Sequence, residues 1–292
     1  MTAQETSGGG SRFPAEAAFW AALACYLALV VAFAWNATPL AQTLAGMGIL
    51  AACIHATLFY GWKDALVLFA ICVIITFAIE NIGTLTGLPF GRYHFEVGAN
   101  LPHVGLIPVI VGPLWFGMGY FSWIVAGTLL GAPARPDKGF DLVAWPIVAA
   151  FVMTQWDVVM DPPLSTISKA WIWHDGGAHF GVPLSNYVGW LLTSWLFSQA
   201  FALYLTRRRE LPVQPEANER TFRMVAVALY LGSGLTHLTP WLIGESGEVM
   251  DAAHHVWQIG DLRRSAVITM LFTVFFTSLL AAARLVLKGR FR

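Results

Sequence analysis

Long apolar stretches separated by short polar segments fill most of this chain. Eight stretches are about 20 residues or longer with few charges, which is the length a helix needs to cross ~30 Å of hydrocarbon. They cover residues 15–35, 40–60, 64–85, 104–130, 141–160, 184–206, 221–243 and 265–287. Backbone polar groups in lipid must be hydrogen-bonded internally, so these stretches predict helices. The predicted fold is an all-α integral membrane protein, a bundle of about eight transmembrane helices, or seven if the first stretch lies outside the bundle.

The composition agrees with a membrane location. The chain is 57% hydrophobic and 12% charged, whereas about 25% of residues are charged in an average soluble protein. A formal net charge of zero gives no basic field for nucleic acid. Cys25, Cys53 and Cys72 all fall inside predicted spans. We interpret them as small buried hydrophobic residues rather than disulfide or metal partners.

The distribution of basic residues predicts the orientation, because Lys and Arg collect on the cytoplasmic side of membrane proteins. With the amino terminus inside, 13 of the 17 Lys and Arg residues lie on the inner side. The outer side has Arg92, Lys169, Arg263 and Arg264. The sequence therefore predicts a prokaryotic cytoplasmic-membrane protein with both termini cytoplasmic, and with segments 83–104, 161–183 and 240–264 on the outer face. Residues 1–14 are predicted to be a disordered tail, 15–287 a single transmembrane domain and 288–292 a short basic tail.

The third stretch contains an acidic residue about one turn inside its predicted end. A carboxyl group at this depth is expensive, and burial favours its neutral, proton-donating form. Glu80 is therefore a candidate general acid, although it could also pair with a helix neighbour or reach the interface. A glycine- and proline-rich turn follows, and then come residues expected to re-enter or cap the bundle: Arg92, Tyr93, His94 and Glu96.

The fifth stretch ends with two aspartates on one helix face. Asp157 and Asp161 are four residues apart, about one turn, and their mutual repulsion favours keeping a proton on one of them. Trp156 lies beside the deeper aspartate. Pro162 and Pro163 are predicted to end the helix. The alternative for Asp161 is a capping group at the interface.

The sixth stretch opens with Asn186 and continues to Trp190. An asparagine at the start of a helix is most simply an N-terminal cap. A second role, positioning a water molecule or a carboxyl group, remains open for Asn186.

Five segments together resemble the carotenoid 1′,2′-hydratase family of membrane proteins of carotenoid biosynthesis, which includes bisanhydrobacterioruberin hydratase. They are 80–83 (ENIG), 87–95 (GLPFGRYHF), 157–162 (DVVMDP), 171–173 (WIW) and 181–190 (GVPLSNYVGW). The resemblance runs in order from about residue 60 to 280. It implies a hydro-lyase that adds water to the terminal 1,2 double bond of an acyclic carotenoid and gives a tertiary 1-hydroxy group, with no cofactor or metal. The implied partners are a lycopene-like or longer acyclic carotenoid, water and the lipid bilayer.

Such a reaction needs an acid that protonates the alkene and a group that holds water. Our candidates for these catalytic roles are Glu80, Asp157 and Asp161. The candidates for substrate binding or water positioning are Arg92, Tyr93, His94, Glu96, Trp156, Asn186 and Trp190.

Other classes of protein fit the sequence less well. A di-iron carotenoid hydroxylase or ketolase needs clustered histidine motifs, and the eight histidines lack His-x-x-x-His and His-x-x-His-His spacings. A membrane prenyltransferase needs two Asp-rich Mg²⁺-diphosphate motifs, and only the Asp157 and Asp161 pair is partly suitable. A transporter or pigment-binding scaffold remains a further alternative, although the paired broken helices of many transporters are not evident.

Overall fold

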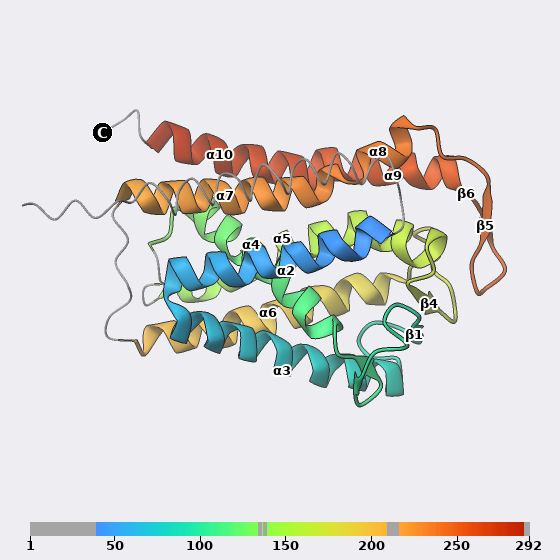
Figure 1. Cartoon of the computed structure of the whole chain (residues 1–292), viewed down its shortest axis with the longest axis horizontal. Helices are drawn as coiled ribbons and strands as arrows, with labels where there is room; N and C mark the ends of the chain where they lie inside the picture. The colour runs from blue at the N-terminus through green and yellow to red at the C-terminus, as the bar shows by residue number, and fades with distance from the viewer. Residues whose placement is uncertain (1–38, 134–135, 137–138, 209–215, 289–292) are drawn as a thin grey trace, which may run out of the picture.

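The structure is a computed structural model that describes residues 39–133, 136, 139–208 and 216–288 (Figure 1). The predicted tail 1–14, the first predicted span 15–35 with Cys25, and residues 289–292 lie outside the described residues. Cys53 and Cys72 are free thiols, and Cys72 is buried.

Helices running along one common axis form the body of the molecule (Figure 1). They are α2 (Pro39–Tyr60), α3 (Trp62–Thr86), α4 (Val111–Leu130), α5 (Phe140–Asp161), α6 (Leu184–Thr206), α7 (Glu216–Leu235), α8 (Leu238–Leu242), α9 (Ile259–Met270) and α10 (Phe276–Lys288). Short π-helical turns follow α5 (η1, Pro162–Ile167) and join α9 to α10 (η2, Leu271–Phe275).

Helix α4 lies at the centre of the bundle and contacts α2, α3, α5, α7 and α10. Most of its residues are buried, so it is enclosed by protein more than the other helices are. Its Trp123 stacks on Trp145 of α5, with ring centroids 4.3 Å apart and planes at 10°. Gly127 permits this packing, because a Cβ atom there would overlap the Trp145 ring. The core is thus built from close helix contacts through aromatic and small residues.

Five helical segments in the described ranges are long and apolar enough to cross a membrane. They are Trp62–Thr86, Val111–Leu130, Phe140–Ile167, Leu184–Thr206 and Ile259–Leu287. A shorter apolar helix covers Gly46–Tyr60. The prediction of a mostly helical membrane protein is confirmed in this coarser form, and the number of eight spans stays a prediction.

The fourth helix begins later than predicted. It starts at Val111 rather than at residue 104, because residues before it form a hairpin of β2 (His103–Val104) and β3 (Ile107–Pro108). The Asn81 side chain fixes this hairpin by donating to the Val104 carbonyl (2.9 Å) and accepting from the Leu106 N–H (2.8 Å). A side chain from a distant helix thus replaces the helical hydrogen bonds expected there.

The α-helix α5 ends at Asp161, directly before Pro162 and Pro163, as predicted, but a further helical turn that was not predicted follows it. The helix continues beyond Asp161 as the π-helical turn η1 to Ile167. Prolines have no N–H to donate, and they are tolerated where a widened turn begins. Within this turn the Ser165 Oγ donates to the Asp161 carbonyl at 2.8 Å.

The seventh predicted span, 221–243, is not one continuous helix. Helix α7 ends at Leu235, a turn follows, and the short helix α8 continues to Leu242. At the break the Thr236 hydroxyl donates to the Ser233 carbonyl (2.6 Å), and the His237 N–H donates to the Gly234 carbonyl (3.1 Å). These local bonds compete with regular helical ones.

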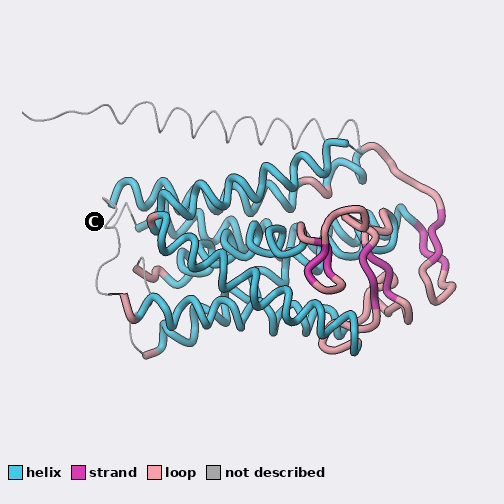
Figure 2. The backbone as a smooth tube through the Cα atoms, turned by 60° about the horizontal axis from the view of Figure 1, so that its bottom comes forward, coloured by secondary structure: helices cyan, strands magenta, loops and turns pink. Residues whose placement is uncertain are grey.

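Short antiparallel strand pairs gather at one end of the bundle, which the all-helical prediction did not include (Figure 2). β1 (Tyr93–Phe95) pairs with β4 (Trp171–Trp173), and β5 (Glu248–Met250) pairs with β6 (Val256–Gln258). They belong to the three long segments predicted to share the outer face. We refer to this region as the strand-bearing end.

Candidate active site

The β1–β4 pair brings two distant segments together over the ends of α3 and α5. Tyr93 lies opposite Trp173, and Phe95 lies opposite Trp171. The Tyr93 and Trp173 rings are 4.8 Å apart. The strand alternation turns Tyr93 inward while His94, the next residue, is exposed. The pairing therefore places aromatic side chains directly above the acidic residues at the helix ends.

Glu80 is buried and both of its carboxyl oxygens accept hydrogen bonds. The Tyr93 hydroxyl donates to Oε2, and Trp115 Nε1 of α4 donates to Oε1 at 2.9 Å. Burial, reinforced by the neighbouring Glu80, raises the pKa of Tyr93 well above its ordinary value, so the phenol remains a donor. Glu80 is thus held by groups from a strand and from the central helix.

Asp157 and Asp161 are fully buried and share one donor. The Asn186 amide nitrogen donates to Asp157 Oδ2 (3.2 Å) and to Asp161 Oδ2. Trp171 Nε1 donates to Asp161 Oδ1 at 2.6 Å. Asp157 Oδ1 is buried without a hydrogen-bond partner among the described residues. Among the carboxyl oxygens of Glu80, Asp157 and Asp161, this is the one that accepts no hydrogen bond from the described residues.

The three carboxyl groups form one buried group, which we call the carboxyl cluster (Glu80, Asp157 and Asp161). Glu80 interacts electrostatically with both aspartates. Asn186 reaches them from the first turn of α6 and is itself buried. Because its side chain bonds to two carboxyl groups, it does not act as a side-chain cap of its helix, and no such cap bond is found at the start of α6.

An aromatic wall adjoins the carboxyl cluster. Trp115 stacks on Trp190 with ring centroids 3.8 Å apart and planes at 18°, and Trp156 lies 6.1 Å from Trp190. Phe90 packs between α3 and α6 at Gly83 and Gly189. A Cβ atom at Gly189 would overlap its ring. These rings form an apolar, polarisable surface that meets the carboxyl cluster at Glu80, through Trp115.

Arg92, His94 and Glu96 lie apart from this cluster, on the exposed side of the β1–β4 pair. Arg92 forms an ion pair with Asp175, and their side chains are 67% and 54% exposed. The Arg92 hydrogen bond holds the pKa of Asp175 below its ordinary value. His94 bonds to His174 (2.7 Å) and Glu96 (3.0 Å). The structure does not bring these predicted site residues to the buried carboxyl groups.

The structure adds residues to the site that the sequence did not assign. Trp115 and Trp171 donate to the carboxyl cluster. The alternation in 171–173 could have indicated that both tryptophans share one face of a strand. Nothing local in the fourth stretch distinguishes Trp115 from Trp123, the other tryptophan there. Within the described part of the chain, no three His, Cys, Asp or Glu side chains are grouped as metal ligands.

These features define a helical membrane protein with a hydrogen-bonded carboxyl cluster buried at one end of its bundle. The sequence pattern of the family described as "Carotenoid biosynthesis protein" matches residues 40–244. The chain belongs to this carotenoid biosynthesis protein family, which confirms the family indicated by the motifs.

One curated relative is bisanhydrobacterioruberin hydratase of Haloarcula japonica. It is 30% identical over 118 residues, which cover 40% of this chain and 38% of the relative. The match thus spans well under half of either protein. No solved structure matches the chain.

Proposed function

We propose that this protein is a hydratase that adds water across the terminal 1,2 double bond of an acyclic carotenoid and gives a tertiary 1-hydroxy carotenoid. Membership of a carotenoid biosynthesis family and similarity to a protein named as a hydratase support the substrate and reaction class. The observation that carries the proposal is the pair Asp157 and Asp161, buried side by side on one amide donor, with one oxygen of Asp157 unpartnered among the described residues.

The first step is protonation of the alkene. An isolated carbon–carbon double bond is too weak a base to take a proton from water at neutral pH. We assign the proton donor to Asp157, because its Oδ1 has no partner in the described structure and so can face C2 of the substrate. Transfer of this proton to C2 leaves a tertiary cation at C1 and ionised Asp157. Such a general acid contributes about 10²–10⁴-fold in rate.

The second step is capture of the cation by water. Asp161 is already bound by Asn186 and Trp171, which fix the orientation of its carboxyl group. In our proposal Asp161 accepts a proton from the water molecule whose oxygen attacks C1. Transfer of this proton from Asp161 to Asp157 restores the starting state, and the two carboxyl groups are neighbours, since both accept from the same Asn186 amide group. The net change is the addition of one water molecule, without an oxidant or a reductant.

The aromatic wall has a role in this scheme. The face of an aromatic ring stabilises a nearby cation by about 0.5–2 kcal/mol. Within the wall, Trp156 is the neighbour of Asp157 in the sequence, and Trp190 lies one helical turn after Asn186. The two rings contact each other. We assign them to the stabilisation of the C1 cation and to the binding of the apolar polyene.

Glu80 is the second candidate for the acid, but its contacts favour a positioning role. Both of its oxygens already accept hydrogen bonds from Tyr93 and Trp115. Trp115 in turn stacks on Trp190. Glu80 would therefore hold the aromatic wall in place while Asp157 transfers the proton.

The membrane arrangement completes the proposal. We propose eight spans in the prokaryotic cytoplasmic membrane with both termini cytoplasmic, which places the strand-bearing end and the carboxyl cluster near the outer leaflet. The partners are then an acyclic carotenoid, water and lipid, without nucleic acid.

Co-expression in a lycopene-producing bacterium tests the function. The expected result is a more polar carotenoid that carries a tertiary hydroxyl group and is heavier than lycopene by one water molecule. An iron chelator should not change its yield, whereas it would stop an oxygenase. A product heavier by one oxygen atom would indicate another carotenoid-modifying enzyme. Unchanged lycopene that co-purifies with the protein would indicate a pigment-binding or transport protein, and either result contradicts the hydratase.

A further inference from the structure

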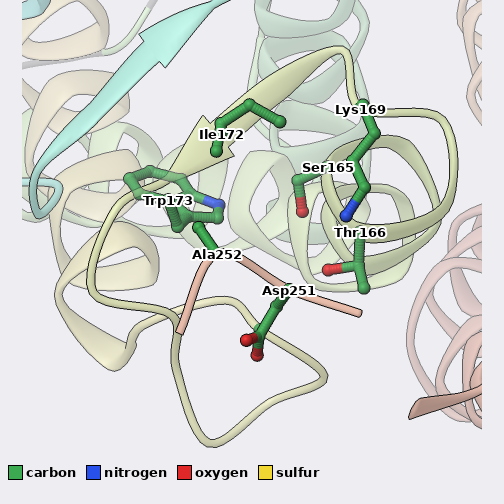
Figure 3. Close-up of a pocket in the computed structure, with 8 residues that line it drawn as sticks. Ser165, Thr166, Lys169, Ile172, Trp173, Asp251 and Ala252 are labelled. Carbon is green, nitrogen blue, oxygen red and sulfur yellow. The ribbon is translucent and has the colours of Figure 1, made fainter. Parts of the chain in front are cut away.

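A small cavity lies at the strand-bearing end (Figure 3), and one of its lining residues, Ser165, bonds to the Asp161 carbonyl. The centre of a water molecule can occupy about 10 Å³ of this cavity, so the cavity has room for about one water molecule. The η1 turn, strand β4 and the loop after β5 contribute its walls. The lining residues that matter here are Ser165, Thr166, Lys169, Trp173, Asp251 and Ala252.

Polar atoms from separate segments converge on this cavity (Figure 3). Trp173 Nε1 is buried and has no hydrogen-bond partner in the described parts of the chain. A buried donor of this kind costs about 1–3 kcal/mol unless it is paired. The Ser165 hydroxyl, which donates to a backbone carbonyl, can still accept a bond. A water molecule between these groups would satisfy the indole and gain the polar partners that a buried water needs.

The outer wall of the cavity is held rigidly. Asp251 is buried and accepts hydrogen bonds from the N–H groups of Ala253 and His255 and from Trp257 Nε1, each at 2.9 Å. Burial opposes its ionisation, but these bonds prevail and hold the pKa of Asp251 below its ordinary value. Lys169 spans the opening and donates to the Met250 carbonyl at 2.7 Å. The loop is therefore fixed in place by charged and hydrogen-bonded groups.

The cavity lies between an exposed residue and buried residues that approach the carboxyl cluster. Ala252, at its outer side, is exposed, while Ser165 and Trp173 at its inner side are buried. Ser165 donates to the Asp161 carbonyl, one turn earlier in the same helix. Trp173 Nε1 comes close to the Asp161 carboxyl group without forming a hydrogen bond to it. A water molecule in the cavity is thus one step from the group that holds the attacking water.

We propose that this cavity is the water port of the enzyme, through which the co-substrate water passes from the aqueous phase at the strand-bearing end to Asp161. The apolar carotenoid reaches the site from lipid, so the two substrates arrive by separate routes. This separation has a chemical reason, because excluding bulk water from the site strengthens the electrostatic interactions between the cation and the groups around it. Trp173 and Ser165 are positioning residues for water in this scheme. The inference rests on the proposed hydratase activity.

Closing the port tests the proposal. Ala252→Met adds a flexible apolar chain at the exposed end of the cavity, outside the carboxyl cluster. We expect kcat for hydration to fall about tenfold or more, because a displaced reactant costs up to about 10²-fold. The Kd for the carotenoid, measured by quenching of tryptophan fluorescence, should stay within about twofold. The matched control is Ala99→Met, which adds the same side chain to an exposed position of another loop and should keep the wild-type kcat.

A second variant keeps the test decisive if Ala252→Met does not accumulate in the membrane. Ser165→Ala removes one hydroxyl group from the inner side of the port, and we expect a fall of about fivefold in kcat with an unchanged Kd. If Ala252→Met accumulates in the membrane and keeps the wild-type kcat, the water-port proposal is overturned. If only Ser165→Ala accumulates, a wild-type kcat in that variant overturns it. If the affinity for the carotenoid falls by the same factor as kcat in these variants, the proposal is also overturned, because the substituted residues then have a structural role. If wild-type protein makes no hydrated product, the proposed function itself fails, which is a separate result.

Discussion

Replacing Asp157 by asparagine should remove the proton donor while leaving the site almost intact. Asp157 Oδ2 accepts one bond, from Asn186 at 3.2 Å, and Oδ1 has no partner in the described structure. An asparagine can keep its carbonyl oxygen toward Asn186 and place its NH₂ group where Oδ1 was. No hydrogen bond is lost, so the free energy of unfolding should change by no more than ~1 kcal/mol.

The effect on catalysis should be far larger than the effect on folding. A general acid contributes about 10²–10⁴-fold, which corresponds to ~2.7–5.4 kcal/mol at 1.36 kcal/mol for each factor of ten. The proton is transferred only in the transition state, so kcat should fall by this factor while KM stays nearly constant. Protonation of the alkene is then the step that Asp157→Asn blocks.

The assay follows hydration of an acyclic carotenoid in lipid vesicles that contain the purified variant, with the product separated by chromatography. Tryptophan fluorescence reports carotenoid binding independently. Asp64→Asn is a matched control, since Asp64 is also buried but lies far along α3 from Glu80 and bonds to Tyr204 (2.6 Å) and Arg208. We expect this control to lower stability and to keep the kcat of the folded protein within about twofold.

Glu80→Gln separates the two candidate acids. Glutamine replaces one of the two carboxyl oxygens with an NH₂ group. Only one of the donors Tyr93 and Trp115 then keeps an oxygen acceptor in its present position, so this variant should lose ~1–3 kcal/mol of stability. Its kcat should fall less than that of Asp157→Asn. A loss below about tenfold in Asp157→Asn would refute the assignment of the acid. A loss of about 10²-fold or more in folded Glu80→Gln, without such a loss in Asp157→Asn, would transfer the role to Glu80.

Three further predictions follow from the same contacts. Asn186→Leu removes the donor shared by both aspartates, so it should lower the melting temperature in thermal scans and reduce kcat by about 10²-fold or more; wild-type values would contradict the shared-donor arrangement. Trp171→Phe removes one bond to Asp161 and should lower kcat about 5- to 30-fold, corresponding to ~1–2 kcal/mol, with normal carotenoid binding; an unchanged rate would show that this bond is not needed. Arg92→Met breaks only an exposed ion pair and should leave kcat within about twofold, and a larger loss would return Arg92 to the site. Arg92 lowers the pKa of Asp175, so any stability from this pair is present at a pH above the ordinary pKa of an aspartate and is lost as the pH falls through the lowered pKa. A difference in melting temperature between Arg92→Met and wild type should therefore disappear in acid.

The sequence by itself determined the membrane class, the positions of most helices and the family. Hydropathy is a local property, and a run of about 20 apolar residues forms a helix in lipid whatever lies beside it. For this reason the predicted stretch 184–206 coincides with α6. The depth of Glu80 and Asp157 was visible in the same way, since an acidic residue inside an apolar run is conspicuous without any knowledge of its neighbours.

Only the tertiary structure decided which of the candidate residues meet. The pairing of β1 with β4 joins segments about 80 residues apart, and it buries Tyr93 while it leaves His94 exposed. No local pattern encodes this pairing, because both segments are short and lie outside the apolar runs. The same holds for Trp115, whose bond to Glu80 depends on the packing of α3 against α4.

The end of the fifth helix shows the same limit. Two consecutive prolines predict the end of the α-helix from their missing N–H groups, and α5 does end at Asp161, but they do not predict the π-helical turn that follows. That turn positions Ser165 and leads into the loop that returns as β4, where Trp171 binds Asp161. The position of an acidic residue within an apolar run determines that its carboxyl group lies inside the helical bundle. The long-range contacts of the folded chain determine which hydrogen-bond donors reach that group.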